Sequence, residues 1–231
     1  METGYKVLVD VEKTLYDNEA SFLQYLNDFV EEHHGEALLN DLETLPKSVD
    51  PFVPVDSYLT GSELRFDSDD VEGWGYDGVY ETFAELRGWD ENSQEKFMNG
   101  DGNGWPGFHE AVDMIWTGEL PYQIQLMEPD APENFRKLRG LEGVREVVIG
   151  TSRGNFFSDY DVESAVETRL EQDFGVENSE VLFLEDKSGN ADIYIDDNPE
   201  MDLREDEQQI AIRTPYNDHL PDENLVESFS N

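Results

Sequence analysis

The chain has 231 residues, of which 55 are acidic and 15 are Lys or Arg, so its formal net charge at pH 7 is −40. This charge argues against a nucleic-acid polymer as partner, because like charges repel and few basic side chains are available to displace counterions. The absence of cysteine excludes disulfides, thiolate metal sites and cysteine nucleophiles. No run of about 18 apolar residues is present, and residues 1–10 lack a signal-peptide pattern, so we expect a cytoplasmic protein that does not contact a membrane.

The acidic excess is compatible with a folded chain. The sequence contains 13 Phe, 10 Tyr and 4 Trp, whereas highly charged disordered chains contain few aromatic residues. At a salt concentration of about 1 M the Debye length falls to about 3 Å, so repulsion between surface carboxylates is screened. The composition is similar to that of proteins from salt-loving archaea and their viruses, and we expect the protein to work in strong salt.

The N-terminal half begins with a clear pattern and then becomes irregular. Residues 5–9 form a short apolar run that ends at Asp10 and predicts a buried strand. A helix is predicted next, because apolar residues recur at helical spacing at Phe22, Tyr25, Leu26, Phe29 and Val30. Between residues 33 and 130, prolines and glycines separate short helical patterns such as residues 79–86 and 110–116. We expect this segment to be a mostly helical lobe with long loops.

The C-terminal half shows a regular alternation of strands and helices. Helices are predicted from Pro132 to Gly140 and from Val162 to Gly175, because proline favours the first turn and glycine the position after the last turn. Strands are predicted at residues 146–150, 181–184, 192–195 and 209–212. This alternation predicts an α/β fold with a parallel sheet and helices on both faces.

Three of the predicted strands end in polar residues, namely Asp10, Thr151 and the pair Asp196 and Asp197. In an open parallel sheet the carboxyl ends of the strands form the ligand crevice, so we expect these residues to meet. Carboxylates that face one another repel, and oxygen ligands of this kind suit Mg²⁺. Lys187 precedes the last of these strands and is placed to balance the charge of a phosphoryl group.

Four segments in this order resemble the sequence motifs of the haloacid-dehalogenase superfamily. They are Asp-Val-Glu-Lys-Thr-Leu at residues 10–15, Val-Ile-Gly-Thr-Ser-Arg at residues 148–153, Lys187, and Ala-Asp-Ile-Tyr-Ile-Asp-Asp-Asn-Pro at residues 191–199. Residues 132–217 are most similar to the 5'(3')-deoxyribonucleotidase branch. The resemblance implies a Rossmann-like three-layer core formed by residues 1–17 and 130–231, with a mostly helical cap inserted at residues 18–129.

The resemblance also implies catalytic roles. Asp10 attacks phosphorus, and Glu12, two residues later, protonates the leaving alcohol and then activates water. Thr151 donates a hydrogen bond to a phosphoryl oxygen, and Lys187 balances its charge. The family has Asp where this chain has Glu12, and the additional methylene changes the reach of the carboxyl group.

The resemblance further implies a Mg²⁺ cofactor and a set of binding residues. Asp10, the backbone carbonyl of Glu12 and Asp196 hold the metal, with Asp197 supporting them. Ser152 and Arg153 are the candidate substrate-binding residues. Ser152 helps to position the loop, and Arg153 replaces the lysine that the nucleotidase branch would have on the helix at residues 162–174.

The expected activity is hydrolysis of a phosphomonoester through an aspartyl-phosphate, with a nucleoside monophosphate as the first candidate substrate and another small phosphometabolite as the second. The substitution at Glu12 keeps open a catalytically weak chain that binds a phosphate ligand or a protein partner. A calcium-binding loop at residues 99–110 is a third alternative. There Asn99 and Pro106 depart from the EF-hand pattern, so a glycine-rich turn is favoured.

Overall fold

The computed structural model describes residues 4–18, 20–25, 108–154, 160–199, 201–214, 220, 224–226 and 229. The chain divides into two compact units, one formed by residues 1–18 and 113–231 and the other by residues 19–112. In the second unit, residues 20–25 are helical, in agreement with the start of the predicted helix. The first boundary lies one residue from the predicted one, whereas the second lies at 112/113 instead of 129/130.

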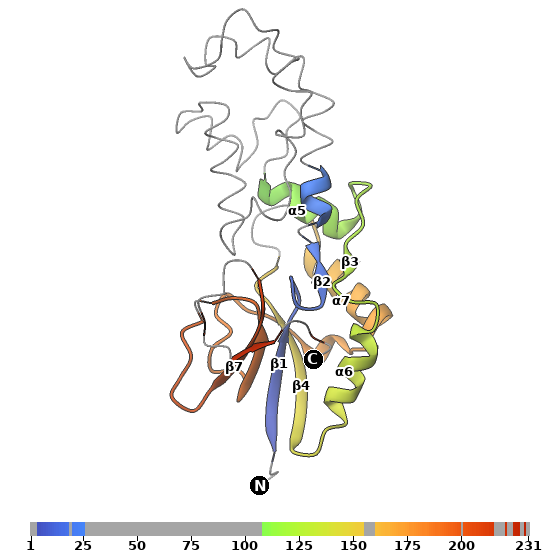
Figure 1. Cartoon of the computed structure of the whole chain (residues 1–231). Helices are drawn as coiled ribbons and strands as arrows, with labels where there is room; N and C mark the ends of the chain where they lie inside the picture. Colours follow the sequence, from blue (N-terminus) through green and yellow to red (C-terminus); the bar gives the residue numbers. More distant parts are fainter. Residues whose placement is uncertain are drawn as a thin grey trace, which may run out of the picture. The chain divides into compact units, whose positions relative to one another are not determined.

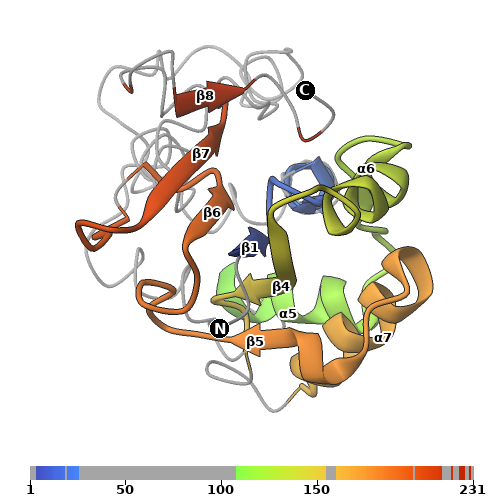
Figure 2. The ribbon, with the colours of Figure 1, turned by 90° about the horizontal axis from the view of Figure 1, so that it is seen from below.

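The first unit is built on a parallel sheet of six strands in the order β5-β4-β1-β6-β7-β8 (Figures 1 and 2). All five pairings between neighbouring strands are parallel. The strands are β1 (Tyr5–Asp10), β4 (Val144–Thr151), β5 (Val181–Phe183), β6 (Ile193–Asp196), β7 (Gln208–Ile212) and β8 (Leu225–Val226). The five predicted strands and their parallel arrangement are confirmed, and β8 is an addition.

Two helices cover one face of the sheet. Figure 2 shows α6 (Ala131–Arg139) and α7 (Val162–Phe174) on the same side of the strands. The rings of Phe135 and Phe174 meet edge to face with centroids 5.5 Å apart. Gly175 ends α7 in the left-handed conformation (φ 66°), which glycine adopts without the steric cost of a side chain. Both predicted helices and their glycine ends are therefore confirmed.

The opposite face of the sheet is covered by segments that precede β6 and β7. Leu8, Val148 and Tyr194 form a buried cluster on this face. Side chains that pack against the cluster come from both connecting segments and from β5, and they are Leu182, Leu184, Ala191, Met201 and Leu203. Together with the flanking helices, the sheet is consistent with a three-layer α/β fold.

A short hairpin explains why residues 113–129 belong with the sheet. β2 (Tyr16–Asp17) pairs antiparallel with β3 (Gln125–Leu126), which follows α5 (Phe108–Thr117). Tyr16 is fully buried, and its hydroxyl donates to Asp173 Oδ2 at 2.8 Å. Its ring packs edge to face on Trp116 and Phe174, with both centroid separations at 5.7 Å. Strands of two residues give no periodic signal, so the sequence did not predict this contact.

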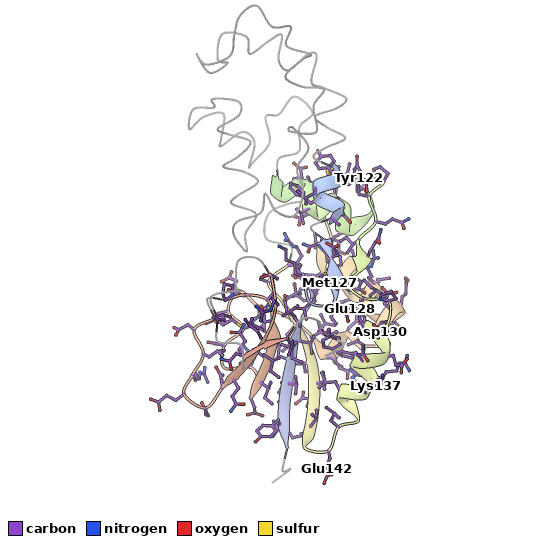
Figure 3. The ribbon with its side chains drawn as sticks, in the orientation of Figure 1. Tyr122, Met127, Glu128, Asp130, Lys137 and Glu142 are labelled. Carbon is purple, nitrogen blue, oxygen red and sulfur yellow. The ribbon has the colours of Figure 1, made fainter. Side chains whose placement is uncertain are left out.

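Around α6, charged side chains such as those of Asp130, Lys137 and Glu142 lie on the outside of the described structure (Figure 3). Lys137 and Glu142 are exposed, and Lys137 forms an ion pair with Glu133 one turn earlier, at 3.0 Å. Among the residues that the structure describes, no helix combines the length and apolar character needed to cross a membrane.

Candidate metal and phosphoryl-transfer site

The register of the sheet brings the predicted site residues to one edge. Asp10, the last residue of β1, lies opposite Gly150 on β4, directly before Thr151. On the other side, Val9 lies opposite Ile195 on β6, directly before Asp196. Three neighbouring strands therefore end at the same level, each with a buried polar side chain.

The carboxylates of Asp10, Asp196 and Asp197 form one group at this edge. One ligand oxygen from each residue lies within 4.8 Å of the others. The three residues are 3%, 1% and 8% exposed, respectively, so water screens their mutual repulsion poorly. A set of three buried carboxylates can bind a metal ion, because a divalent cation offsets the repulsion between their negative charges.

Lys187 partly neutralises the acidic group. Its ammonium nitrogen contacts Asp10 Oδ1 and lies 2.7 Å from Asp196 Oδ2. Burial lowers the pKa of Lys187, but the two carboxylates outweigh burial and hold the pKa above its ordinary value. Burial and the neighbouring Asp196 raise the pKa of Asp10, although Lys187 opposes the change. The ammonium of Lys187 thus contacts two of the three carboxylates, those of Asp10 and Asp196.

A network around Tyr194 fixes the loop that carries Lys187. The Tyr194 hydroxyl accepts hydrogen bonds from the backbone N–H groups of Asn190 (3.0 Å) and Ala191 (2.9 Å) and donates to Glu207 Oε1 (3.2 Å). The Asn190 side chain in turn donates to the carbonyl oxygen of Lys187 at 3.0 Å. This support was not predicted from the sequence. Its one signal was a tyrosine within a buried strand, since a buried hydroxyl needs a partner.

The Glu12 side chain lies outside the carboxylate group. Thr151 Oγ1 donates to Glu12 Oε2 at 3.0 Å, and Arg153 Nε lies 3.4 Å from Glu12 Oε1. The backbone N–H of Arg153 donates to Thr151 Oγ1 at 2.9 Å. Glu12, Thr151 and Arg153 therefore contact one another and form a second group beside the three carboxylates.

Asp113 is a further site residue that sequence reasoning missed. It lies on α5, is fully buried, and its Oδ1 is 3.8 Å from Arg153 Nη1. Arg153 is also largely buried, with 17% of its side chain exposed. The available signal was weak, namely an acidic residue three positions before the buried Trp116 on an amphipathic helix. Ser152 is exposed on the loop beside Arg153.

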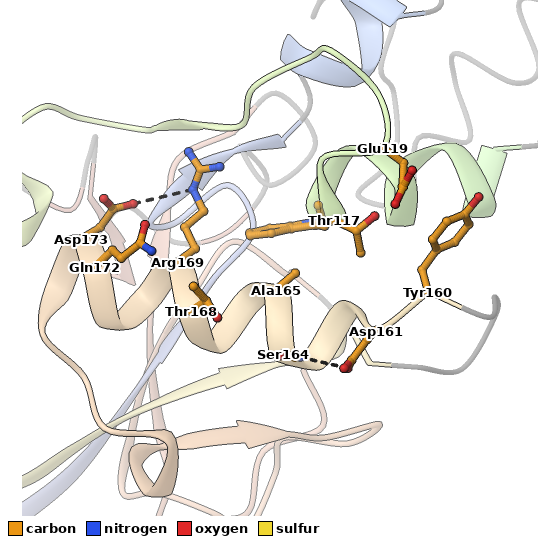
Figure 4. Close-up of a pocket in the computed structure, with 11 residues that line it drawn as sticks. Thr117, Glu119, Tyr160, Asp161, Ser164, Ala165, Thr168, Arg169, Gln172 and Asp173 are labelled. Atoms are coloured by element: carbon orange, nitrogen blue, oxygen red, sulfur yellow. Dashed lines mark hydrogen bonds and ion pairs between the residues drawn. The ribbon is translucent and has the colours of Figure 1, made fainter.

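A separate cavity of about 720 Å³ opens along α7. Figure 4 shows Thr117 and Glu119, from the end of α5 and the turn after it, facing one side of α7. Arg169 in this cavity forms an ion pair with Asp173 at 3.6 Å. None of the site residues predicted from the sequence lines it, so the cavity is distinct from the acidic group.

Several predictions fall on residues that are not described, among them the end of the first predicted helix at Leu26, Phe29 and Val30, the helical pattern at residues 79–86 and most of the cap expected at residues 18–129. Residues 99–107 of the possible calcium loop lie outside the described residues, and Glu110 lies within α5. Residues 215–217, the end of the segment similar to the deoxyribonucleotidase branch, also lie outside them.

No protein-family model matches the chain, and a search among curated proteins finds no match either. What the chain does must therefore be inferred from its own residues.

Proposed function

We propose that the chain is a Mg²⁺-dependent phosphomonoester hydrolase of the haloacid-dehalogenase type, with Asp10 as nucleophile. The observation that carries this proposal is the convergence of Asp10, Asp196 and Asp197 at one edge of the sheet, with their ligand oxygens within 4.8 Å of one another. Lys187 contacts two of these carboxylates. A nucleophilic carboxylate beside a cation-binding group and an ammonium is suited to transfer of a phosphoryl group.

Mg²⁺ fits the donor set, because hard oxygen ligands and a small number of carboxylates are what this ion prefers. Asp10 and Asp196 would hold it with Asp197 in support, and the resemblance adds the backbone carbonyl of Glu12. When bound, the ion would supply positive charge next to the phosphoryl oxygens. Lys187 would share this task as a second, fixed positive charge.

The reaction proceeds in two displacements. A carboxylate oxygen of Asp10 bonds to phosphorus while the bond from phosphorus to the ester oxygen breaks, and Glu12 gives its proton to the departing alcohol. Glu12, now a carboxylate, then takes a proton from water as the water oxygen attacks the phosphorus of the aspartyl-phosphate. Inorganic phosphate leaves, Asp10 is free again and Glu12 has regained its proton.

The proposed substrate is a small phosphomonoester. A nucleoside monophosphate is the first candidate, because residues 132–217 resemble the deoxyribonucleotidase branch, and another phosphometabolite is the second. A nucleic-acid polymer is disfavoured by the net charge of −40, since a long phosphate backbone needs many basic contacts.

The direct test is release of inorganic phosphate from a panel of nucleoside and sugar monophosphates, with Mg²⁺ and strong salt. We expect hydrolysis of at least one monoester, and we expect Asp10→Asn to abolish it. Asp161→Asn is the matched control, because Asp161 caps the start of α7 and Asn caps a helix equally well. Hydrolysis that survives in Asp10→Asn, or no hydrolysis of any monoester by the unaltered chain, would contradict the proposal.

One observation favours a second function, a phosphate-binding chain with little turnover. Both carboxylate oxygens of Glu12 are engaged, one by Thr151 and the other by Arg153. If these contacts hold Glu12 away from the reacting atoms, the phosphorylated Asp10 would accumulate. Mass spectrometry after incubation with substrate separates the two functions, since only the second leaves a persistent mass increase of one phosphoryl group.

A further inference from the structure

We propose that Arg153, anchored by Asp113, is a positioning residue that fixes the Glu12 carboxylate for proton transfer. This inference rests on the proposed function, in which Glu12 is the acid and base. The Arg153 guanidinium lies between two carboxylates, with Nε 3.4 Å from Glu12 Oε1 and Nη1 3.8 Å from Asp113 Oδ1. Its side chain is 17% exposed and that of Asp113 is fully buried, so the contacts are shielded from water.

A glutamate at this position needs to be held in place. Compared with the aspartate of the family, Glu12 has one more rotatable bond and one more methylene, so its carboxyl group can occupy more positions. A displacement of about 1 Å at a reacting group can lower a rate by about 10²-fold. In the structure each oxygen of Glu12 has its own partner, Thr151 for Oε2 and Arg153 for Oε1.

Of these two partners, Arg153 is the one that can remain during the reaction. Thr151 has a single hydroxyl proton, which it donates to Glu12. When that proton turns to a phosphoryl oxygen, as the proposed role of Thr151 requires, Thr151 no longer donates to Glu12. The Thr151 oxygen still accepts the backbone N–H of Arg153, and the guanidinium still holds Glu12.

The surroundings of Arg153 favour positioning over substrate binding. Two carboxylates already compensate its positive charge, so a phosphoryl dianion would have to displace one of them. Arginine suits the bridging task, because its guanidinium presents several N–H donors in a fixed planar arrangement. A lysine ammonium at the same position is a compact point charge without this planar arrangement of donors.

The test begins with Arg153→Gln, which removes the guanidinium but keeps the backbone N–H that binds Thr151. We expect kcat to fall by about 10–100-fold, in line with a misplaced catalytic group, while KM stays within about 3-fold because substrate contacts are unchanged. Asp113→Asn should lower kcat in the same direction by a smaller factor, and Arg153→Lys should lie between Arg153→Gln and the unaltered chain. Arg139→Gln is the control, since it removes a comparable ion pair, that with Glu180, and should leave kcat unchanged.

The opposite kinetic pattern would overturn the inference. An increase in KM at unchanged kcat would make Arg153 a substrate-binding residue, and unchanged values of both would show that it has no role. A second background sharpens the result. In Glu12→Asp the side chain is shorter, so we expect its carboxyl group no longer to reach the guanidinium. Arg153→Gln should then lower kcat much less than it does in the unaltered chain. An equal loss of kcat in both backgrounds would refute the positioning role of Arg153.

A measurement without activity separates this inference from the proposed function. Thermal unfolding of Glu12→Gln, Arg153→Gln and the double variant measures the coupling between the two side chains. We expect the double variant to lose less stability than the sum of the single losses, and additive losses would overturn the contact. If the unaltered chain hydrolyses no monoester, the proposed function fails, and this coupling alone supports or overturns the hold of Arg153 on Glu12.

Discussion

Replacing Lys187 with methionine should destabilise the chain strongly, because it removes the ammonium that lies between two buried carboxylates. The side chains of Lys187, Asp10 and Asp196 are 13%, 4% and 1% exposed. Removing one partner of a buried ion pair costs about 3–5 kcal/mol. Burial and Asp196 already raise the pKa of Asp10, so proton uptake relieves part of the charge and we expect about 3 kcal/mol, the lower end of that range.

Thermal unfolding measures this loss, and the chain offers a matched control. For a chain of this length about 1 kcal/mol corresponds to a change in Tm of about 2–4 °C, so Lys187→Met should lower Tm by about 6–12 °C. Lys137→Met makes the same substitution at an exposed ion pair, with Lys137 and Glu133 64% and 58% exposed. Such pairs contribute about 0.3–0.5 kcal/mol, so the control should shift Tm by less than about 2 °C.

Addition of Mg²⁺ tests the charge argument itself. A cation that binds only the folded chain stabilises it by about 2.7 kcal/mol at a concentration of 100 times its Kd. Without the ammonium of Lys187 the acidic group is more negative, so Mg²⁺ should raise the Tm of Lys187→Met more than that of the unaltered chain. A loss no larger than that of Lys137→Met, or a loss that Mg²⁺ does not reduce, would refute the reasoning.

Three further predictions concern the packing of the sheet, the loop that carries Lys187 and one ion pair outside the site. Gly150→Ala should lower stability by about 1–3 kcal/mol in chemical denaturation, because a Cβ atom there would lie 2.7 Å from the buried Leu8 side chain; no loss would show that Leu8 can move. Tyr194→Phe should speed hydrogen exchange of the two loop N–H groups that its hydroxyl accepts and lower kcat, whereas unchanged exchange would contradict its role. Burial raises the pKa of Glu180, but a backbone N–H and Arg139 outweigh burial and hold the pKa below its ordinary value. Arg139→Gln should therefore lower stability by less than about 1 kcal/mol. This loss should be present above about pH 4.3 and should fade as the pH falls through the lowered pKa of Glu180. A loss that grows in acid would contradict this.

The part of the site that the sequence predicted follows from local patterns and one rule of topology. Apolar runs that end at Asp10, Thr151 and Asp196 mark buried strands with polar ends. Parallel strands present these ends at one edge, so their convergence did not depend on knowing any side-chain contact. The strand order still had to come from the structure, because nothing in the runs states which strand pairs with which.

The supporting residues could not be predicted, because each acts on a partner that only tertiary packing brings near. Glu12 and Thr151 are 139 positions apart, and no local pattern pairs them. Asp113 reads as one more acidic residue among the 55 of the chain, and only its complete burial beside Arg153 distinguishes it. The pairing of β2 with β3 has a similar origin, since it involves only two residues from each strand.

Because the site is buried, the effect of salt on the exposed carboxylates can be distinguished from an effect of salt on the site. At about 1 M salt the Debye length is about 3 Å, so repulsion among exposed carboxylates weakens, whereas Lys187 and its two partners are shielded by protein rather than by ions. Lowering the salt should thus unfold the chain through its surface before it alters the site. We expect activity and circular dichroism to be lost together as salt is removed. Activity that disappears while the dichroism spectrum is unchanged would mean that salt acts on the site directly, and that the acidic group exchanges ions more freely than its burial implies.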